Sequence, residues 1–356
     1  MSEAPVLITG GAGFIGSNIA DSFLNEGCEV IVFDALARQG VETNLEWLLS
    51  RHGSRVRPVI SDIRDAGALE EAVAKAGAVV HLAAQVAVTT SLDLPQDDFA
   101  VNGQGTLNLL EAVRRKGDGT PVLFASTNKV YGHLGALELR AETDRHVPAD
   151  PAIAENGVGE AQPLEFATPY GCSKGVADQY VLDYARTFGL RTAVLRMSCI
   201  YGPRQFGTED QGWVAHFLIQ ALEHQPLTLY GDGRQVRDIL HVRDAVAAYR
   251  GVLRNIDALS GRAFNLGGGP ENAVSLRIML REIEALTGAP VDVRRDDWRP
   301  GDQLYFVADT RRLQQAIGWS AKTGWREGLR DLAGWIGENS ALIRRVRALQ
   351  MEKLIA

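Results

Sequence analysis

Three side chains in the middle of the chain have the types and spacing needed for acid-base chemistry at a hydroxyl group. Tyr170 and Lys174 lie four residues apart, so on a helix the phenol and the ammonium project from one face toward a common ligand. A free phenol has a pKa near ~10, and a neighbouring cation favours its ionised form. Thr127 follows an apolar run and offers a hydroxyl to the same ligand. The three groups predict proton transfer to and from an alcohol.

A glycine-rich turn near the N-terminus predicts a partner for this chemistry. Gly10, Gly13 and Gly16 stand between an apolar run and a helix-length stretch that begins with Phe14 and Ile15. Such a turn lets the backbone approach a diphosphate, whose charge then meets the amide groups of the helix N-terminus. This spacing is typical of dinucleotide-binding folds.

The residue that ends the second apolar run selects the dinucleotide. Asp34 lies 18 residues beyond Gly16, where a carboxylate accepts hydrogen bonds from ribose hydroxyls and repels a 2′-phosphate. Arg38 is the kind of residue that NADP-binding proteins use, but Asp34 lies closer to the end of the run. We therefore expect NAD. The further cofactor contacts are expected where later apolar runs end and in the helix that follows, at Asp62, Ile63, Leu82, Ala83, Ala84, Gln85 and Asn102.

The alternation of elements predicts the fold class and the domains. Apolar runs rich in β-branched residues, typical of strands, occur at 5–9, 29–34, 55–60, 78–82, 122–126 and 192–197, and helix-length stretches at 14–25, 99–115 and 170–188. This pattern predicts an α/β protein with a Rossmann-type doubly wound parallel sheet. We expect an NAD-binding domain over 1–196, rejoined by strands at 236–240 and 263–267, and a smaller, interleaved substrate-binding lobe over 197–235 and 268–356. The long segment 132–169 is expected to be a functional loop or lid, and 329–354 to be one helix.

Composition excludes several classes of protein. A formal net charge of -7 and a pI of 5.6 argue against a nucleic-acid partner. No run reaches the ~18 apolar residues of a membrane span. Cys28, Cys172 and Cys199 are widely spaced, so we expect neither a disulfide framework nor a metal site, and a cytoplasmic location.

These motifs resemble the extended short-chain dehydrogenases/reductases that act on nucleotide sugars, and the resemblance covers essentially the whole chain. It implies that Tyr170 is the base, that Lys174 binds the nicotinamide ribose and stabilises the phenolate, and that Thr127 stands where many relatives have serine. Ala35 departs from the pattern, because many relatives place asparagine there.

Within this family several strings most resemble epimerases that invert C2 of a CDP-sugar. They are Ser126-Thr-Asn-Lys-Val-Tyr-Gly132, Tyr170-Gly-Cys-Ser-Lys174, Tyr201-Gly-Pro-Arg-Gln-Phe206, Asp210-Gln-Gly-Trp213 and Gln235-Val-Arg-Asp238. A dehydratase would typically have Asp-Glu after Thr127, whereas Asn128 and Lys129 follow it here. An epimerase needs only one oxidation and its reversal, so NAD would stay bound and be recycled.

The substrate is expected to be held through its nucleotide diphosphate. Arg204 and Arg237 are the candidates for the diphosphate, because a guanidinium pairs with phosphate oxygens in a bidentate way. Gln205 and Gln303 are expected near the nucleotide or sugar, and Lys129 near the sugar. A UDP-hexose 4-epimerase would use the same groups on another carbon, and a nucleotide sensor without catalysis is a third alternative. The resemblance also implies a homodimer or homotetramer.

Overall fold

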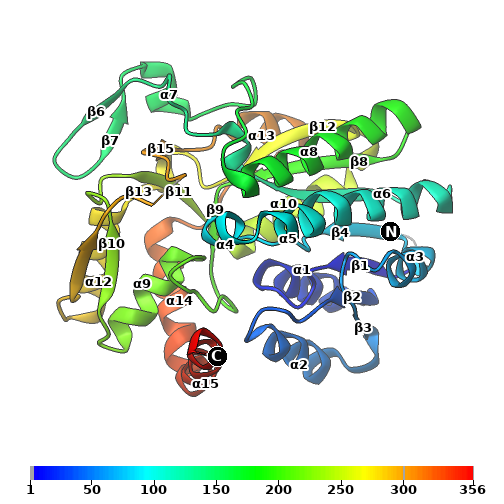
Figure 1. Ribbon diagram of the computed structural model, residues 1–356, viewed down its shortest axis with the longest axis horizontal. Helices are drawn as coiled ribbons and strands as arrows, with labels where there is room; N and C mark the ends of the chain where they lie inside the picture. Colours follow the sequence, from blue (N-terminus) through cyan, green and yellow to red (C-terminus); the bar gives the residue numbers. More distant parts are fainter. Residues whose placement is uncertain (1–3, 300, 356) are drawn as a thin grey trace.

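A seven-stranded parallel sheet forms the centre of the computed structural model, which describes residues 4–299 and 301–355 (Figure 1). The strands lie in the order β12-β8-β5-β4-β1-β2-β3. This is the doubly wound arrangement that the sequence predicted, with the reversal of strand order beside β1. The strands are β1 (Val6–Thr9), β2 (Val30–Asp34), β3 (Val56–Ile60), β4 (Ala78–His81), β5 (Val122–Thr127), β8 (Thr192–Met197) and β12 (Arg262–Leu266).

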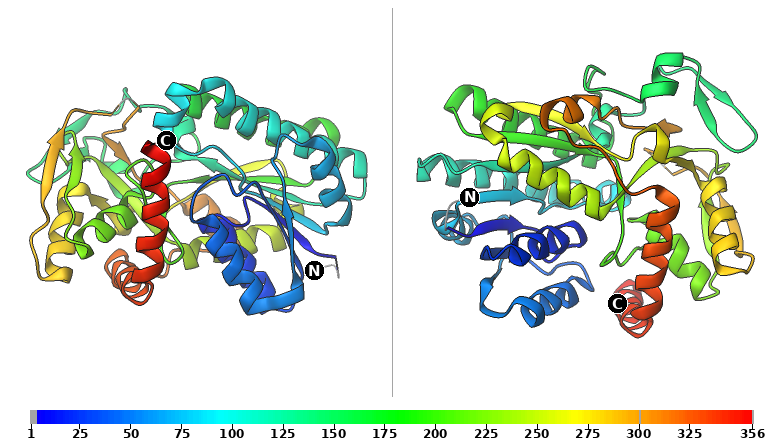
Figure 2. Two further views of the ribbon diagram at one scale, coloured as in Figure 1. Left: turned by 60° about the horizontal axis from the view of Figure 1, so that its bottom comes forward. Right: turned by 180° about the vertical axis from the view of Figure 1, so that it is seen from behind.

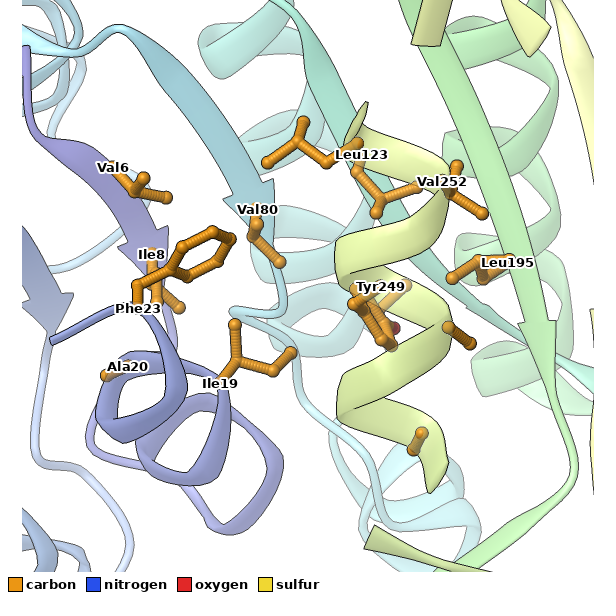
Figure 3. Packing of buried hydrophobic residues seen from close by; sticks show 14 of the residues in the cluster. Val6, Ile8, Ile19, Ala20, Phe23, Val80, Leu123, Leu195, Tyr249 and Val252 are labelled. Atoms are coloured by element: carbon orange, nitrogen blue, oxygen red, sulfur yellow. The ribbon is translucent and has the colours of Figure 1, made fainter. Parts of the chain in front are cut away.

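Helices cover both faces of this sheet, which is why its strands are apolar on both sides. Along β1, Val6 and Ile8 pack toward Ile19 and Phe23 of one helix, whereas Leu7 belongs to the core on the opposite face (Figure 3). The first face is covered by α1 (Phe14–Asn25), α2 (Val41–His52), α10 (Val242–Arg254) and α11 (Ile256–Leu259). The second face is covered by α3 (Ala66–Lys75), α6 (Gly105–Lys116) and α8 (Thr168–Phe188).

The smaller part of the molecule has its own sheets and its own core. β9 (Cys199–Tyr201), β11 (Val236–His241), β13 (Ala273–Ser275) and β15 (Tyr305–Phe306) form one sheet, and β10 (Leu227–Tyr230) pairs with β14 (Val293–Asp296). Figure 2 shows this part beside the main sheet. Its helices are α9 (Trp213–Leu222), α12 (Leu276–Thr287), α14 (Trp325–Glu338) and α15 (Ser340–Ile355).

Two expectations about these segments were wrong. The strand at 236–240 does not return to the main sheet, because β11 pairs with β9, β13 and β15; only the run at 263–267 does so, as β12. The expected single helix at 329–354 is divided into α14 and α15 at Asn339.

The segment 132–169 contains more regular structure than a plain loop. It holds the hairpin of β6 (Leu139–Ala141) and β7 (His146–Pro148) and the short helix α7 (Pro151–Asn156). The remaining helices are α4 (Val88–Asp93), α5 (Pro95–Phe99) and α13 (Arg311–Ile317), with a π-helical turn at Ala100–Gln104 and 3-10 turns at Gly53–Arg55, Asn128–Tyr131 and Pro270–Asn272. Among the described residues, the helices are too short or too polar to cross a bilayer.

Candidate active site

Two glycines of the turn between β1 and α1 leave no room for a side chain. Gly10 has a φ of +69°, and a Cβ on it would lie 2.7 Å from the backbone nitrogen of Ala83. A Cβ on Gly16 would lie 2.2 Å from the carbonyl oxygen of Gly10. Gly13 is the N-cap of α1 and provides no side-chain cap. The turn therefore offers bare backbone and a helix N-terminus to an anion, as a dinucleotide diphosphate requires.

The Asp34 carboxylate stands beside this turn, at the end of β2. Its oxygens accept hydrogen bonds from the backbone N–H groups of Ala12 (3.0 Å) and Leu36 (2.9 Å). Burial raises the pKa of Asp34, and the backbone N–H groups around it act in the opposite direction. The side chain is therefore fixed between the glycine turn and the strand end, where the ribose of an NAD molecule would lie.

Tyr170, Thr127 and Lys174 come together at the carboxyl end of β5. The Thr127 hydroxyl lies close enough to the Tyr170 phenol to lower its pKa, so the first turn of α8 stands beside the end of the strand. Both side chains are buried, with 8% of each residue exposed. This places two hydroxyl groups where one substrate hydroxyl can contact both.

The protonation states of this site differ from the expectation that Lys174 lowers the pKa of the phenol. Burial raises the pKa of Tyr170 to about 12, against the lowering effect of the hydrogen bond with Thr127. Burial also lowers the pKa of Lys174 to about 7, opposed by the charges of Asp178 and Asp98. Because burial disfavours both charged forms, the chain alone does not produce a phenolate, and the positive charge of an oxidised nicotinamide would have to favour it.

A buried network that sequence reasoning missed holds the catalytic helix against the end of β4. Asp98 is wholly buried and accepts hydrogen bonds from Ser173, from Gln85 (2.8 Å) and from Asn102 (3.2 Å). Asn102 also donates to Ser173 (3.0 Å) and accepts from the Gln85 backbone N–H (2.9 Å). Asn102 and Gln85 therefore help to fix Ser173, the residue before Lys174, through Asp98. The one available signal was Ser173, a polar residue directly before Lys174.

A second missed network connects the strand that carries Thr127 with β8. Asp178 accepts a hydrogen bond from Ser126 (2.7 Å) and two from the guanidinium of Arg196 (2.8 and 2.9 Å). All three residues are buried. A buried ion pair with these hydrogen bonds fixes the position of Ser126, the residue before Thr127.

Residues from the smaller part of the molecule contact the 3-10 turn Asn128–Tyr131, which follows Thr127. Lys129 donates a hydrogen bond of 2.9 Å to the carbonyl of Gly301, and Asn128 donates one of 3.2 Å to the side chain of Gln303. Burial and the nearby Arg237 lower the pKa of Lys129 to about 8. Gln303 is fully buried and also donates to the Gly132 carbonyl. Its amide oxygen accepts the hydrogen bond from Asn128, and its place near the nucleotide or sugar stays a prediction.

The two arginines expected at the diphosphate lie in different environments. Arg237 is near Lys129, and its guanidinium is 3.5 Å from a carboxylate oxygen of Asp302. Arg204 instead has a φ of +75°, and its guanidinium lies 4.0 Å from the ring centroid of Trp47 and 5.9 Å from that of Trp335. Arg204 therefore joins α2 to α14, which was not expected.

Several other predicted contacts have partners within the chain. Gln205 donates to the Ile200 carbonyl, while its Oε1 is buried with no partner in the described residues, which leaves an acceptor for a ligand. Asp62 forms an ion pair with Arg64, which lowers its pKa. Ile63 is buried in the core. The run of Leu82, Ala83, Ala84 and Gln85 lies directly after β4, with Ala83 against Gly10 as expected for the path of a cofactor.

Comparison with known proteins agrees with this geometry. The model of the NAD dependent epimerase/dehydratase family matches residues 6–267. CDP-paratose 2-epimerase of Salmonella typhi is 43% identical over 93% of this chain and 98% of its own length. A putative UDP-glucose 4-epimerase of Methanocaldococcus jannaschii is 31% identical, over 94% of this chain and 99% of that protein.

Solved structures show the same fold with the cofactor bound. A double mutant of dTDP-glucose 4,6-dehydratase from Streptomyces venezuelae, solved with NAD, superposes with a TM-score of 0.82 at 30% identity, covering 96% of this chain and 99% of the other. The UDP-glucose 4-epimerase of Thermus thermophilus, in complex with NAD, gives a TM-score of 0.77 at 33% identity, covering 93% and 98%. Given the glycine turn, Asp34 and these matches, the chain is a member of the NAD dependent epimerase/dehydratase family, and its cofactor is NAD.

Proposed function

We propose that this protein is an isomerase that inverts C2 of a CDP-sugar of the paratose type. The observation that carries the proposal is the pairing of Thr127 and Tyr170 beside a turn in which Asn128 and Lys129 are held by residues 301–303. The similarity to CDP-paratose 2-epimerase over nearly the whole chain supports the choice of sugar and carbon.

The arrangement assigns a part of the reaction to each side chain. Thr127 and Tyr170 bind the C2 hydroxyl, and Tyr170 takes and later returns its proton. Lys174 holds the nicotinamide ribose next to the phenol. NAD bound beside these groups would supply the hydride chemistry at C2, an oxidation and then its reversal from the opposite face of the sugar, with no net change in the cofactor.

The sugar must turn over between the two hydride transfers, so its binding has to depend on the nucleotide diphosphate. Arg237 and Lys129 are the cations placed beside the 3-10 turn Asn128–Tyr131, and the Gln205 Oε1 is an acceptor with no partner among the described residues. We assign the diphosphate to Arg237 and the sugar to Lys129. Arg204 is left out of this assignment because it stacks on Trp47.

Elimination of water is disfavoured by the residues that follow Thr127. A dehydratase needs an acid and a base at this point, whereas an amide and a buried lysine bonded to Gly301 occupy it here. A UDP-hexose 4-epimerase remains the second candidate, because two epimerases of that kind are similar over more than nine-tenths of the chain.

A panel of CDP-, UDP-, GDP- and dTDP-sugars incubated in deuterated water, with products examined by NMR, tests the proposal. Inversion at C2 of CDP-paratose without solvent deuterium at C2 is the expected result. Deuterium at C2 would show deprotonation and contradict hydride transfer. Inversion at C4 of a UDP-hexose would favour the second candidate, and bound NAD without turnover of any sugar would indicate a nucleotide sensor.

We also infer a cytoplasmic homo-oligomer, a dimer or tetramer. Tyr180 and Phe188 of α8 are 44% and 49% exposed, and aromatic side chains on one helix favour burial against a second copy. The three cysteines are free, as in a reducing compartment. Light scattering coupled to size-exclusion chromatography would give the mass in solution, and a monomer would contradict the inference.

A further inference from the structure

A second cavity gathers four arginines away from the candidate active site. It has a volume of about 260 Å³ and lies between α8, β8, the start of β12 and α13, which are neighbours in Figure 1. Its charged lining consists of Arg186, Arg196, Arg262, Arg312 and Glu160. The protein as a whole carries a formal net charge of -7, so this local excess of positive charge is not a general property of its surface.

Three of these arginines have no carboxylate to neutralise them. In the described part of the chain, no ion pair involves Arg186, Arg262 or Arg312, whereas the nearby Arg191 and Arg311 pair with Asp257 and Asp309. Two carboxylates lie at or beside the cavity, so its four arginines still leave an excess of positive charge. Glu160 accepts a hydrogen bond of 2.7 Å from the backbone N–H of Asn265, and Asp178 is bound to Arg196.

Two of the cations each lie near the same aromatic ring. The guanidinium carbons of Arg262 and Arg312 lie 4.8 Å and 5.6 Å from the ring centroid of the buried Phe264. The attraction of each cation to the ring offsets part of their mutual repulsion. An anion bound in the cavity that both residues line would offset more of this repulsion.

The floor of the cavity is rigid. Arg196 is 5% exposed, donates two hydrogen bonds to Asp178 and donates a third of 3.2 Å to the Tyr131 hydroxyl. Its guanidinium is therefore already ordered, which lowers the entropic cost of binding a ligand against it. The exposed Arg186 and Arg312 stand at the mouth and leave the cavity accessible from solvent.

We propose that this cavity is a binding site for a phosphate group, separate from the site of the nucleotide sugar. Guanidinium groups recognise phosphate through paired, charge-assisted hydrogen bonds, and several arginines together select a dianion over chloride. The volume approaches the ~300 Å³ of small-ligand pockets, so it accommodates a phosphate with a small organic group attached. The ligand is therefore free inorganic phosphate or a small phosphomonoester.

Isothermal titration calorimetry of the enzyme saturated with NAD and CDP tests this site, because these ligands fill the candidate active site. Inorganic phosphate and ribose 5-phosphate are the two probes, at constant ionic strength with chloride as the reference anion. Binding of phosphate alone identifies the free anion, and tighter binding of ribose 5-phosphate identifies a phosphomonoester. Binding of neither probe would overturn the proposal.

Variants locate the binding. Arg262→Ala with Arg312→Ala should weaken phosphate binding at least ~10-fold, since each lost charge-assisted hydrogen bond is worth more than the ~1.4 kcal/mol of a tenfold change. The matched control is Arg294→Ala with Arg295→Ala, which removes two adjacent exposed arginines of β14. Arg312→Ala alone, on an exposed helical position, serves if the double variant does not fold. Equal binding by the cavity variants and the control would overturn the proposal.

Discussion

The Lys174 ammonium donates a hydrogen bond of 2.7 Å to the carbonyl of Ala125, two residues before Thr127 in the same strand. The nitrogen also lies 4.2 Å from the ring centroid of Phe124. The lysine is thus bound to β5 before any cofactor is considered. Both contacts favour a cation, yet burial dominates and lowers the pKa of Lys174 to about 7.

The lowered pKa of Lys174 makes stability depend on pH. Between about pH 7 and the ~10.4 of an exposed lysine, the unfolded chain binds a proton that the folded protein lacks, so this residue makes stability rise with pH. Below about pH 7 the buried lysine must carry its charge, and the folded state is destabilised by the full cost of burying that charge. Above about pH 10 the lysine is neutral in both states, and this cost vanishes. Lys174→Met removes the group, so its stability relative to the unmodified protein should be greatest near pH 6 and decline toward pH 10.

Urea denaturation at about pH 6, 8 and 10 measures this difference. The exposed Lys75→Met is the control for loss of one positive charge. A stability difference between Lys174→Met and the unmodified protein that stays constant over this range would contradict the assignment of a depressed pKa.

Replacing the phenol should separate catalysis from cofactor binding. Tyr170→Phe removes the phenol hydroxyl beside Thr127 and keeps the ring, so turnover should fall by about 10²- to 10⁴-fold while NAD stays bound. Turnover is followed by NMR of the sugar, and bound NAD is quantified after denaturing the purified protein. Tyr180→Phe on the exposed side of the same helix is the control. Undiminished turnover of Tyr170→Phe would exclude its role as the base.

The parts of the site that could be predicted from sequence are those built from local pattern. The glycines before α1, Asp34 at the end of β2 and the four-residue spacing of Tyr170 and Lys174 each depend on one turn or one helix face. Parallel strands bring such segments to one sheet edge, so local order was enough to predict their meeting.

The remainder depends on contacts between distant segments, which local pattern does not encode. Arg204 was expected at the diphosphate because of its guanidinium, but it has a positive φ and its side chain lies over Trp47, more than 150 residues away in sequence. Asp98 carried no prediction from the sequence, because its burial against Ser173 depends on α5 packing onto α8. The same limit applies to residues 236–240, whose local sequence does not say which sheet they join; β11 pairs with β9, β13 and β15.

The tight packing of the glycine turn predicts graded effects of added methyl groups. A Cβ on Gly16 would lie 2.2 Å from the Gly10 carbonyl oxygen, whereas on Gly13 the same atom would be 3.1 Å away. Gly16→Ala should lower the free energy of unfolding by about 1–3 kcal/mol and reduce bound NAD, and Gly13→Ala should do less.

Gly337→Ala is the control for these variants, because here an added methyl group should raise stability. Gly337 lies in α14 and nothing surrounds its Cβ position within 4 Å, so alanine should stabilise the protein by about 0.5–1 kcal/mol. Urea denaturation and the NAD content of the purified variants are the measurements. Equal effects of Gly13→Ala and Gly16→Ala would contradict the geometry of the turn.

Arg237 and Arg204 lie in different environments, so their replacement by alanine should affect different properties, substrate binding for Arg237 and stability for Arg204. Arg237→Ala should raise the KM for the nucleotide sugar roughly 10-fold or more, as expected for loss of a charge-assisted hydrogen bond to the diphosphate. Arg204→Ala should leave KM within about twofold and lower stability by about 0.5–2 kcal/mol, because it removes a cation from the face of Trp47. Initial rates over a range of substrate concentrations give KM, and urea denaturation gives stability. A large rise in KM for Arg204→Ala without loss of stability would return this residue to the diphosphate site and show that its stacking on Trp47 yields when substrate binds.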